Sequence, residues 1–359
     1  MAAPSLNRPL PRPQSQRLAG DRTHRARAVF WLLLALLAAM ALLSVGTGAS
    51  GVSLPGVLAD LATGQQIAAR DRVVLLDIRL PRLALGLLIG AALAVSGALM
   101  QGLFRNPLAD PGIVGVGAGA GLGAVLAIVL GGLLPATLAA TAGPHLVPLA
   151  AFLGGWGTVL LLYRTATRAG RTSVATMLLA GIALAALAGA ATGVLIYLAD
   201  DRQLRDLTFW GMGSLAGASW ARLAAAAPLI LPALLAAPLL ARGLNALALG
   251  EAAAAHLGIP VQRVKRHAVL CVAAATGAAV AVAGGIGFVG IVVPHLLRLA
   301  TGPDHRFLLP NAALLGAALL LGADLIARLI VAPAELPIGI VTALLGAPVF
   351  LWILLRQRG

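Results

Sequence analysis

Residues 111–163 contain no Asp, Glu, Lys or Arg, and this charge-free stretch is far longer than the about 20 residues that one membrane crossing needs. Glycine and proline residues between positions 131 and 144 divide it into two predicted helices. Soluble domains carry about a quarter charged residues, whereas only 11% of these 359 residues are charged and 60% are hydrophobic. The chain is therefore predicted to be an all-α polytopic membrane protein. A water-soluble globule, a secreted disulfide scaffold and a disordered tail are excluded.

Ten membrane spans account for the apolar segments. The charge-free segment 267–297 is too long for one comfortable span and short for two, with Gly284 and Gly285 at its middle. With two spans there, the inner loops hold 18 basic and 4 acidic residues and the outer loops 8 of each. With one, 15 basic residues lie inside and 11 outside, so the positive-inside rule favours two. The predicted spans are 30–45, 83–104, 111–131, 145–163, 174–198, 221–241, two within 267–297, 307–323 and 336–355.

The regions outside these spans are a tail and two long outer segments. Residues 1–27 are rich in Pro and Arg and are predicted to form a flexible cytoplasmic tail, which leaves 28–359 as the transmembrane domain. Residues 48–80 form a polar excursion. In segment 200–220, charges precede a semi-apolar stretch that is too short to cross roughly 30 Å of hydrocarbon. A short helix at the outer mouth of a pathway fits it better.

The formal net charge of +14 raises the question of nucleic-acid binding. Aromatic residues interleave with none of the basic runs, and a polytopic protein needs positive charge on its cytoplasmic side, so orientation in the membrane explains the charge better. Lys265, the only lysine, has no glycine loop before it, which excludes a P-loop ATPase. Cys271 is the only cysteine, and no pair among the six histidines has the i, i+4 spacing of a helical metal site. We expect no metal site and no catalytic residues.

Two further alternatives concern ion coupling and nucleotide binding. Secondary carriers usually place an acid or an unwound polar site at mid-membrane, but every acidic residue here falls in a loop or near a span end, including Asp324 and Glu335. This argues against an ion-coupled carrier without excluding one, because backbone carbonyls can bind Na⁺. In GVGAGAGLG, Gly115, Gly119 and Gly123 lie along one helix face, which predicts close helix packing rather than a nucleotide loop.

Polar residues at the two membrane faces are the candidate functional groups. On the outer side, Arg79 and Arg82 flank the start of the second span and Arg328 stands near the end of the ninth. They are either headgroup-facing arginines or a basic rim that receives carboxylates from a docking partner. On the inner side, residues 251–257 form a short Ala-rich helix, capped by Gly258, that presents a rigid knob to a cytosolic partner.

Several segments together resemble the FecCD (BtuC-like) family of ABC-importer permeases for iron–siderophores, haem and cobalamin. The similarity covers nearly all of residues 30–355 and excludes the Arg-rich tail. The stretches that carry it are 79–124 with RNPLADPG, MLLAGIAL at 177–184, FWGMGSL at 209–215, GFVGIVVPHLLRLATGPDHRFLLP within 284–310, and ELPIGIVTALLGAPVF within 335–355. The resemblance implies a BtuC-like (type II importer) fold with ten spans and makes residues 28–359 a permease domain.

The resemblance also implies partners and a location. It implies a homodimer in the bacterial inner membrane, with both termini cytoplasmic, two cytosolic ATPase subunits and a periplasmic binding protein that delivers the cargo. The chain itself is then a non-catalytic transport subunit without cofactors, because the ATPase subunits use the ATP and Mg²⁺. No nucleic-acid partner is expected.

The family's functional residues map onto this sequence by resemblance. Arg79 and Arg82 match an RxxR docking pair, and Arg328 in ADLIAR matches a third docking arginine. Span five and the loop before it match the cytoplasmic gate, with Thr172, Ser173 and Thr176. A helix over 206–218 corresponds to the outer element beside the pore. The coupling helix matches Glu251, Ala252, Ala253, His256, Leu257 and Gly258, and departs from the family's E-A-A-x-x-x-G form by one residue.

The stretch DDRQLRDLTFWGMGSL looks most like the haem permease branch. The two propionates of haem suit bidentate Arg contacts, so Arg202 and Arg205 at the outer mouth are candidate cargo contacts, although a solvated surface role also explains them. Met177 and Tyr197 are further candidates. A ferric siderophore or cobalamin on the same scaffold remains the alternative cargo, and an ion-coupled carrier the alternative class. We expect import by alternating access.

Overall fold

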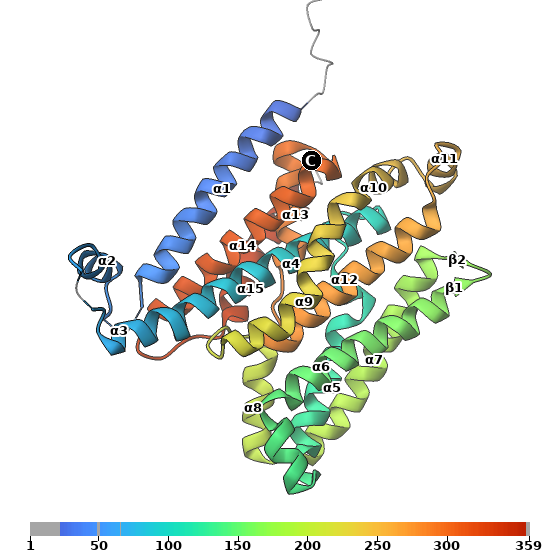
Figure 1. The fold of residues 1–359 in the computed structure, drawn as a ribbon. Helices are drawn as coiled ribbons and strands as arrows, with labels where there is room; N and C mark the ends of the chain where they lie inside the picture. The colour runs from blue at the N-terminus through green and yellow to red at the C-terminus, as the bar shows by residue number, and fades with distance from the viewer. Residues whose placement is uncertain (1–21, 49–50, 65, 357–359) are drawn as a thin grey trace, which may run out of the picture.

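The computed structural model describes residues 22–48, 51–64 and 66–356, and long helices dominate it (Figure 1). The predicted tail lies mainly outside the described residues. The membrane-type helices are α1 (Thr23–Gly46), α4 (Leu80–Phe104), α5 (Val116–Leu130), α6 (Ala136–Ala166), α7 (Val174–Leu198), α9 (Trp220–Ala236), α12 (Val261–Ala283), α13 (Val289–Thr301), α14 (His305–Leu329) and α15 (Ile338–Arg356). The shorter elements are α2 (Leu54–Ala62), α3 (Ala69–Val73), η1 (Val74–Arg79), η2 (Pro111–Val114), η3 (Gly131–Leu133), β1 (Thr167–Arg168), β2 (Arg171–Thr172), α8 (Asp201–Gly211), η4 (Ala237–Leu240), α10 (Ala241–Leu247) and α11 (Glu251–His256).

Each predicted span coincides with a helix. Within the described residues, eight helices are long and apolar enough to cross a membrane, and two apolar helices, α13 and α15, are shorter. The segment 267–297 divides at Gly284, as its central glycines predict: α12 ends at Ala283 and α13 begins at Val289. The 13 residues of α13 extend only about 20 Å, so this second helix is shorter than the predicted full span.

Two groups of helices divide the molecule. In the first, which we call the core group, α4 packs against α14, α12 and α13, and α1 lies along α14 (Figure 1). In the second, the peripheral group, α5 packs against α6 and α7, and α8 adjoins α5. The two groups meet chiefly where α12 contacts α5 and α6. Helix α12 thus provides most of the contact between the two groups.

Small residues allow the helices of each group to approach closely. In the core group, a Cβ atom added to Gly90 would collide with the backbone of Gly316 in α14. In the peripheral group, Gly119 and Gly123 of α5 lie against the backbone of α6 in the same way. The glycine run is therefore a packing surface, which confirms the prediction that it is not a nucleotide loop.

Several boundaries differ from the predictions. Helix α6 begins at Ala136 rather than near residue 145, so Gly143 and Pro144 lie inside it and do not interrupt the helix. Helix α1 begins at Thr23, inside the predicted tail 1–27, because Arg and Ala are good helix formers and long Arg side chains can extend toward water. The outer short helix occupies Asp201–Gly211 instead of 206–218. The reason is a capping box, in which Asp200 accepts the N–H of Gln203 while the Gln203 side chain accepts the N–H of Asp200.

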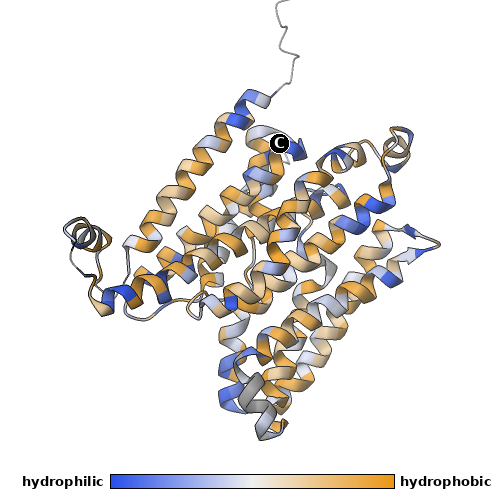
Figure 2. Ribbon diagram, in the orientation of Figure 1, coloured by the Kyte–Doolittle hydropathy of each residue, from blue (hydrophilic) through white to orange (hydrophobic). Residues whose placement is uncertain are grey.

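Hydrophobic residues cover the helix surfaces as well as the interior, and hydrophilic residues gather near the helix ends (Figure 2). In α7, for example, Leu179 is 70% exposed and Leu187 is 68% exposed. Such apolar surfaces are unfavourable in water and are expected where lipid or another membrane protein covers them. The distribution confirms a multi-pass membrane protein.

Candidate functional site

The three predicted docking arginines lie together at one end of the core group. Arg82 is held by two carboxylates: its guanidinium lies 2.8 Å from Asp324 Oδ1 and 2.9 Å from Glu335 Oε1. Arg328 contacts the other oxygen of Asp324 at 3.1 Å. Arg79 donates a hydrogen bond of 2.6 Å to the carbonyl oxygen of Val45 at the end of α1. One cluster thereby ties α1, α4 and α14 to the segment that precedes α15.

This arginine cluster is buried rather than an open basic rim. The side chains of Arg82 and Arg328 are each 8% exposed, and Asp324 is 1% exposed. A buried guanidinium requires such partners, because unpaired charge in a low-dielectric interior is very unfavourable. Glu335, with 35% of its side chain exposed, is the accessible member. Sequence reasoning identified the arginines but did not pair them with Asp324 and Glu335.

The candidate cargo residues are scattered. Arg202 and Arg205 lie on the exposed side of α8, and neither has an ion-pair partner among the residues that the structure describes. Tyr197 is 89% exposed at the end of α7, whereas Met177 is buried in the core. Met177 is therefore not accessible to a cargo molecule in this conformation. The structure does not bring these four residues to one site.

The inner knob is a helix, as predicted. Helix α11 begins at Glu251 and ends at His256, and the chain leaves it through Gly258, whose φ of +78° favours glycine. Ala254 faces inward, and Glu251, Ala252, His256 and Leu257 are exposed. Leu257 shows 64% of its surface. In Figure 1 this knob lies at the opposite end of the molecule from α2 and α3.

The predicted gate residues lie where a short hairpin leads into α7. β1 and β2 pair antiparallel, and the hydroxyl groups of Thr167 and Thr172 lie 3.0 Å apart. Ser173 is the N-cap of α7, and its Oγ accepts the backbone N–H of Thr176 at 3.2 Å. The backbone N–H of Thr172 donates to Gln262 Oε1 of α12 at 2.8 Å. The gate residues are therefore attached to α12.

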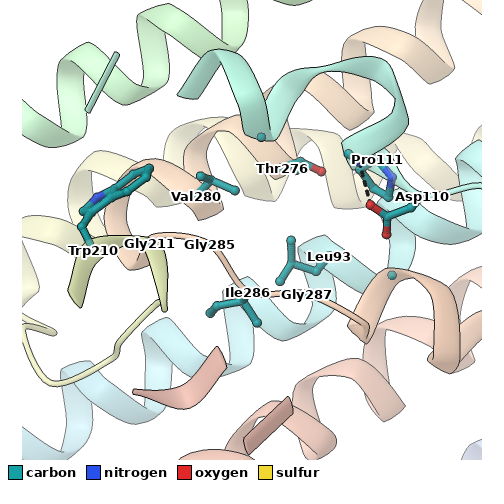
Figure 3. A pocket seen from close by; sticks show the side chains of 13 residues that line it. Leu93, Asp110, Pro111, Trp210, Gly211, Thr276, Val280, Gly285, Ile286 and Gly287 are labelled. Carbon is teal, nitrogen blue, oxygen red and sulfur yellow. Dashed lines mark hydrogen bonds between the residues drawn. The ribbon is translucent and has the colours of Figure 1, made fainter. Parts of the chain in front are cut away.

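A cavity of about 430 Å³ lies between the two groups of helices (Figure 3). Its lining includes Leu93 of α4, Thr276 of α12, Trp210 of α8 and Asp110. Asp110 Oδ1 accepts a hydrogen bond of 2.7 Å from the N–H of Gly112. Apolar side chains and glycine backbone form most of the remaining wall. Asp110 is thus the charged group in a wall that is otherwise mostly apolar.

Asp110 qualifies the expectation that acidic residues avoid the membrane interior. It lies in the loop between α4 and α5, but a Cβ built on Gly290 would be 3.1 Å from Asp110 Oδ2 and 3.2 Å from the carbonyl oxygen of Leu93. Leu93 is in the middle of α4. Helix α5 extends only about 22 Å, so the loop before it reaches this depth. A one-dimensional hydropathy pattern does not show this depth.

The family comparison agrees with the helical architecture. The profile of the FecCD transport family matches residues 35–356. The hemin transport system permease protein of Yersinia pestis is 49% identical over 334 residues, covering 92% of this chain and 96% of the relative. The vitamin B12 import system permease protein of Klebsiella pneumoniae is 43% identical over 301 residues, covering 82% and 86%.

A solved structure shows the same fold. It is an inward-facing conformation of an ABC transporter assigned to the metal-chelate type. The two chains superpose with a TM-score of 0.80 and are 33% identical, and the match covers 92% of this chain and 99% of the other. The prediction of a BtuC-like architecture is thereby confirmed.

Proposed function

This chain belongs to the FecCD transport family, and from that premise we propose that it is the permease subunit of an ATP-binding-cassette importer that carries haem from the periplasm to the cytoplasm. The observation that carries the proposal is the 49% identity with a hemin permease over 92% of the chain. The vitamin B12 permeases share the scaffold at somewhat lower identity, so cobalamin is the second candidate cargo. A ferric siderophore is the third.

The proposed assembly is a homodimer in the bacterial inner membrane, with both termini in the cytoplasm. Two ATPase subunits supply the energy, because the single lysine of this chain does not belong to a phosphate-binding loop. Helix α11 is proposed as the coupling helix that contacts them, because it is exposed at the end of the molecule opposite α2 and α3 (Figure 1). The exposed apolar side of α7 supports lipid, the second copy, or both, as its neighbour.

The proposed mechanism is alternating access. Nucleotide binding favours one membrane conformation and the loaded binding protein favours another, so transport follows from the free-energy difference that each partner imposes. The gate formed by Thr172, Ser173 and Thr176 would open toward the cytoplasm, and α8 with Arg202 and Arg205 would meet the haem propionates at the outer mouth. The weakly polar cavity beside Asp110 suits a cargo that must also be released.

Docking of a periplasmic haem-binding protein is proposed over Arg79, Arg82 and Arg328. Glu335 pairs with one edge of the Arg82 guanidinium and is partly exposed. A carboxylate of the binding protein would therefore compete with Glu335 for Arg82. Charge reversal of all three arginines would also place carboxylates beside Asp324. The sharper variant is therefore Glu335→Gln, which should tighten docking in low salt. Unchanged affinity in a surface-binding assay would contradict this role for Arg82.

Uptake into proteoliposomes tests the function. The chain is reconstituted with and without its ATPase subunits, the lumen receives ATP, and haem-loaded or cobalamin-loaded binding protein is added outside. We expect haem accumulation only with the ATPase present and ATPase stimulation only by the haem-loaded protein. ATPase stimulation by the cobalamin-loaded protein alone would instead identify cobalamin as the cargo. Accumulation driven by an ion gradient without the ATPase would replace the proposal with a secondary carrier.

A further inference from the structure

Lys265 is buried although it carries a positive charge. It lies in the second turn of α12, and only 2% of its side chain is exposed. A buried ammonium group is stable only where carboxylates and hydrogen-bond acceptors replace its water. Its surroundings therefore indicate what it does.

Two acceptors from different parts of the chain surround the ammonium group. Lys265 Nζ forms an ion pair of 2.7 Å with Glu251 Oε1, at the first residue of α11. It also donates a hydrogen bond of 2.7 Å to the carbonyl oxygen of Thr172, at the end of β2. One side chain therefore joins α11 to the residue that precedes α7 by two positions.

Gln262 completes the attachment of Thr172. Its Oε1 accepts the N–H of Thr172 at 2.8 Å, so α12 holds the N–H and the C=O of the same residue. Gln262 and Lys265 are three residues apart and share a face of α12. Because Thr172 is 3% exposed and is followed directly by the N-cap Ser173, its position fixes the start of α7.

The accessible end of this connection is Glu251. Its side chain is 45% exposed, and it borders a hollow of about 730 Å³ whose walls include Arg171, Ala252, Ala255 and Gln262. A partner seated on α11 would therefore displace Glu251 first. The ion pair would then pull the buried lysine, and the lysine would pull Thr172.

We propose that Lys265 is a positioning residue that transmits movement of α11 to the start of α7 through its two contacts with Glu251 and Thr172. This inference rests on the proposed function, in which α11 meets the ATPase and α7 carries the gate. A lysine suits the role because its compact ammonium donates in several directions.

The test compares Lys265→Met with Arg266→Met in the full complex with its ATPase subunits and binding protein. Methionine has a similar length without the charge, and Arg266 is an exposed basic residue on the same helix. We expect K265M to hydrolyse ATP at near the wild-type rate but to take up about tenfold less cargo per ATP, a typical size for coupling between sites. R266M should keep the wild-type ratio.

A conformational measurement gives a second readout. With Cys271→Ala as background, spin labels at Ala255 on α11 and Ala175 on α7 report the distance between the two elements. In the wild type, the distribution of this distance should stay narrow with and without nucleotide. In K265M, the distribution should broaden, or its mean should change, when nucleotide binds. If K265M does not assemble, E251Q takes its place, because the glutamine oxygen can still accept a hydrogen bond from Lys265 while the ion pair is removed.

The outcomes separate the two proposals. If the wild-type complex does not transport with ATP, the proposed function fails, whatever the variants do. If the wild type transports cargo, and K265M or E251Q keeps both the wild-type uptake per ATP and the narrow distribution of label distances, the proposed role of Lys265 is overturned.

Discussion

Helices α4 and α7 are equally apolar but have very different surroundings. The spanning segments that contain them, Ala69–Phe104 and Val174–Leu198, both have a mean hydropathy of 2.2 in their most apolar windows. In the first, 83% of that window is buried within the chain, and in the second only 11%. Hydropathy thus determines that a helix resides in the membrane, and it does not determine whether protein or lipid surrounds it.

Glycines show the same difference between α4 and α7. A Cβ on Gly97 of α4 would overlap the backbone of Gly290 in α13, whereas a Cβ on Gly189 or Gly193 of α7 would meet no atom within 4 Å. The same residue type is required for contact in one helix and occupies open space in the other. We therefore expect substitutions in α4 to affect stability more than similar ones in α7.

The largest effect is expected for Arg82→Met in the core group. It leaves buried Asp324 with only Arg328 as a charged partner, and loss of one member of a buried ion pair costs about 3 kcal/mol or more. Chemical unfolding in detergent measures this change. Arg202→Met on exposed α8 is the matched control and should leave unfolding unchanged. Equal stability of both variants would contradict the importance of the arginine cluster.

An intermediate effect is expected for Gly97→Ala. The added methyl group must displace the backbone of α13, which costs about 1–3 kcal/mol in a well-packed interior. Gly189→Ala, with open space around it, should not lower the unfolding free energy and should raise it by up to about 1 kcal/mol, because Ala has the higher helix propensity. A comparison of the two midpoints under the same denaturant decides between these expectations. Similar losses would mean that α7 is packed as closely as α4.

The smallest effects are expected at two helix caps. Asp304 caps α14 and Ser173 caps α7, so Asp304→Ala and Ser173→Ala should each cost about 1 kcal/mol. The Asp304→Ala substitution should lower the unfolding free energy more than Ser173→Ala, because the Asp304 carboxylate also accepts a hydrogen bond of 2.7 Å from Asn245. Thermal unfolding of the two variants under identical conditions ranks them. A larger loss at Ser173 would reverse the comparison.

The Asp304 effect also depends on pH. Burial disfavours its charged form, but hydrogen bonds from Arg306 and Asn245 outweigh this and hold the pKa of Asp304 at about 2. Since this pKa lies below the ordinary 3.8, the carboxylate stabilises the fold above pH 4 and its contribution is lost as the pH falls toward 2. The wild-type and Asp304→Ala stabilities should therefore converge over that range.

Much of the fold could be predicted from one sequence. Apolar runs and charge asymmetry predicted the spans. Gly284 and Gly285 predicted the interruption between α12 and α13, and Gly258 predicted the end of α11. These features depend on residues close together in the chain. The start of α8 was misplaced because its Asp200 cap lay among charges that suggested a loop.

The candidate site was less accessible to such reasoning. The sequence identified Arg79, Arg82 and Arg328, but the carboxylates that pair with buried Arg82 lie more than 200 positions away from it. It placed Asp110 in a loop without showing that the loop reaches the middle of α4. The docking, gate and cargo roles of these residues stay predictions.

By itself, the sequence determined that this chain is a multi-pass membrane protein and which segments form its apolar helices. Those properties follow from local composition, because lipid solvates apolar side chains and each helix satisfies its own backbone. Only the tertiary structure decided which helices are enclosed and which charges are buried together. Lys265 shows why: its ammonium group is stable only because Glu251 and Thr172, from two separate segments, meet at one point on α12.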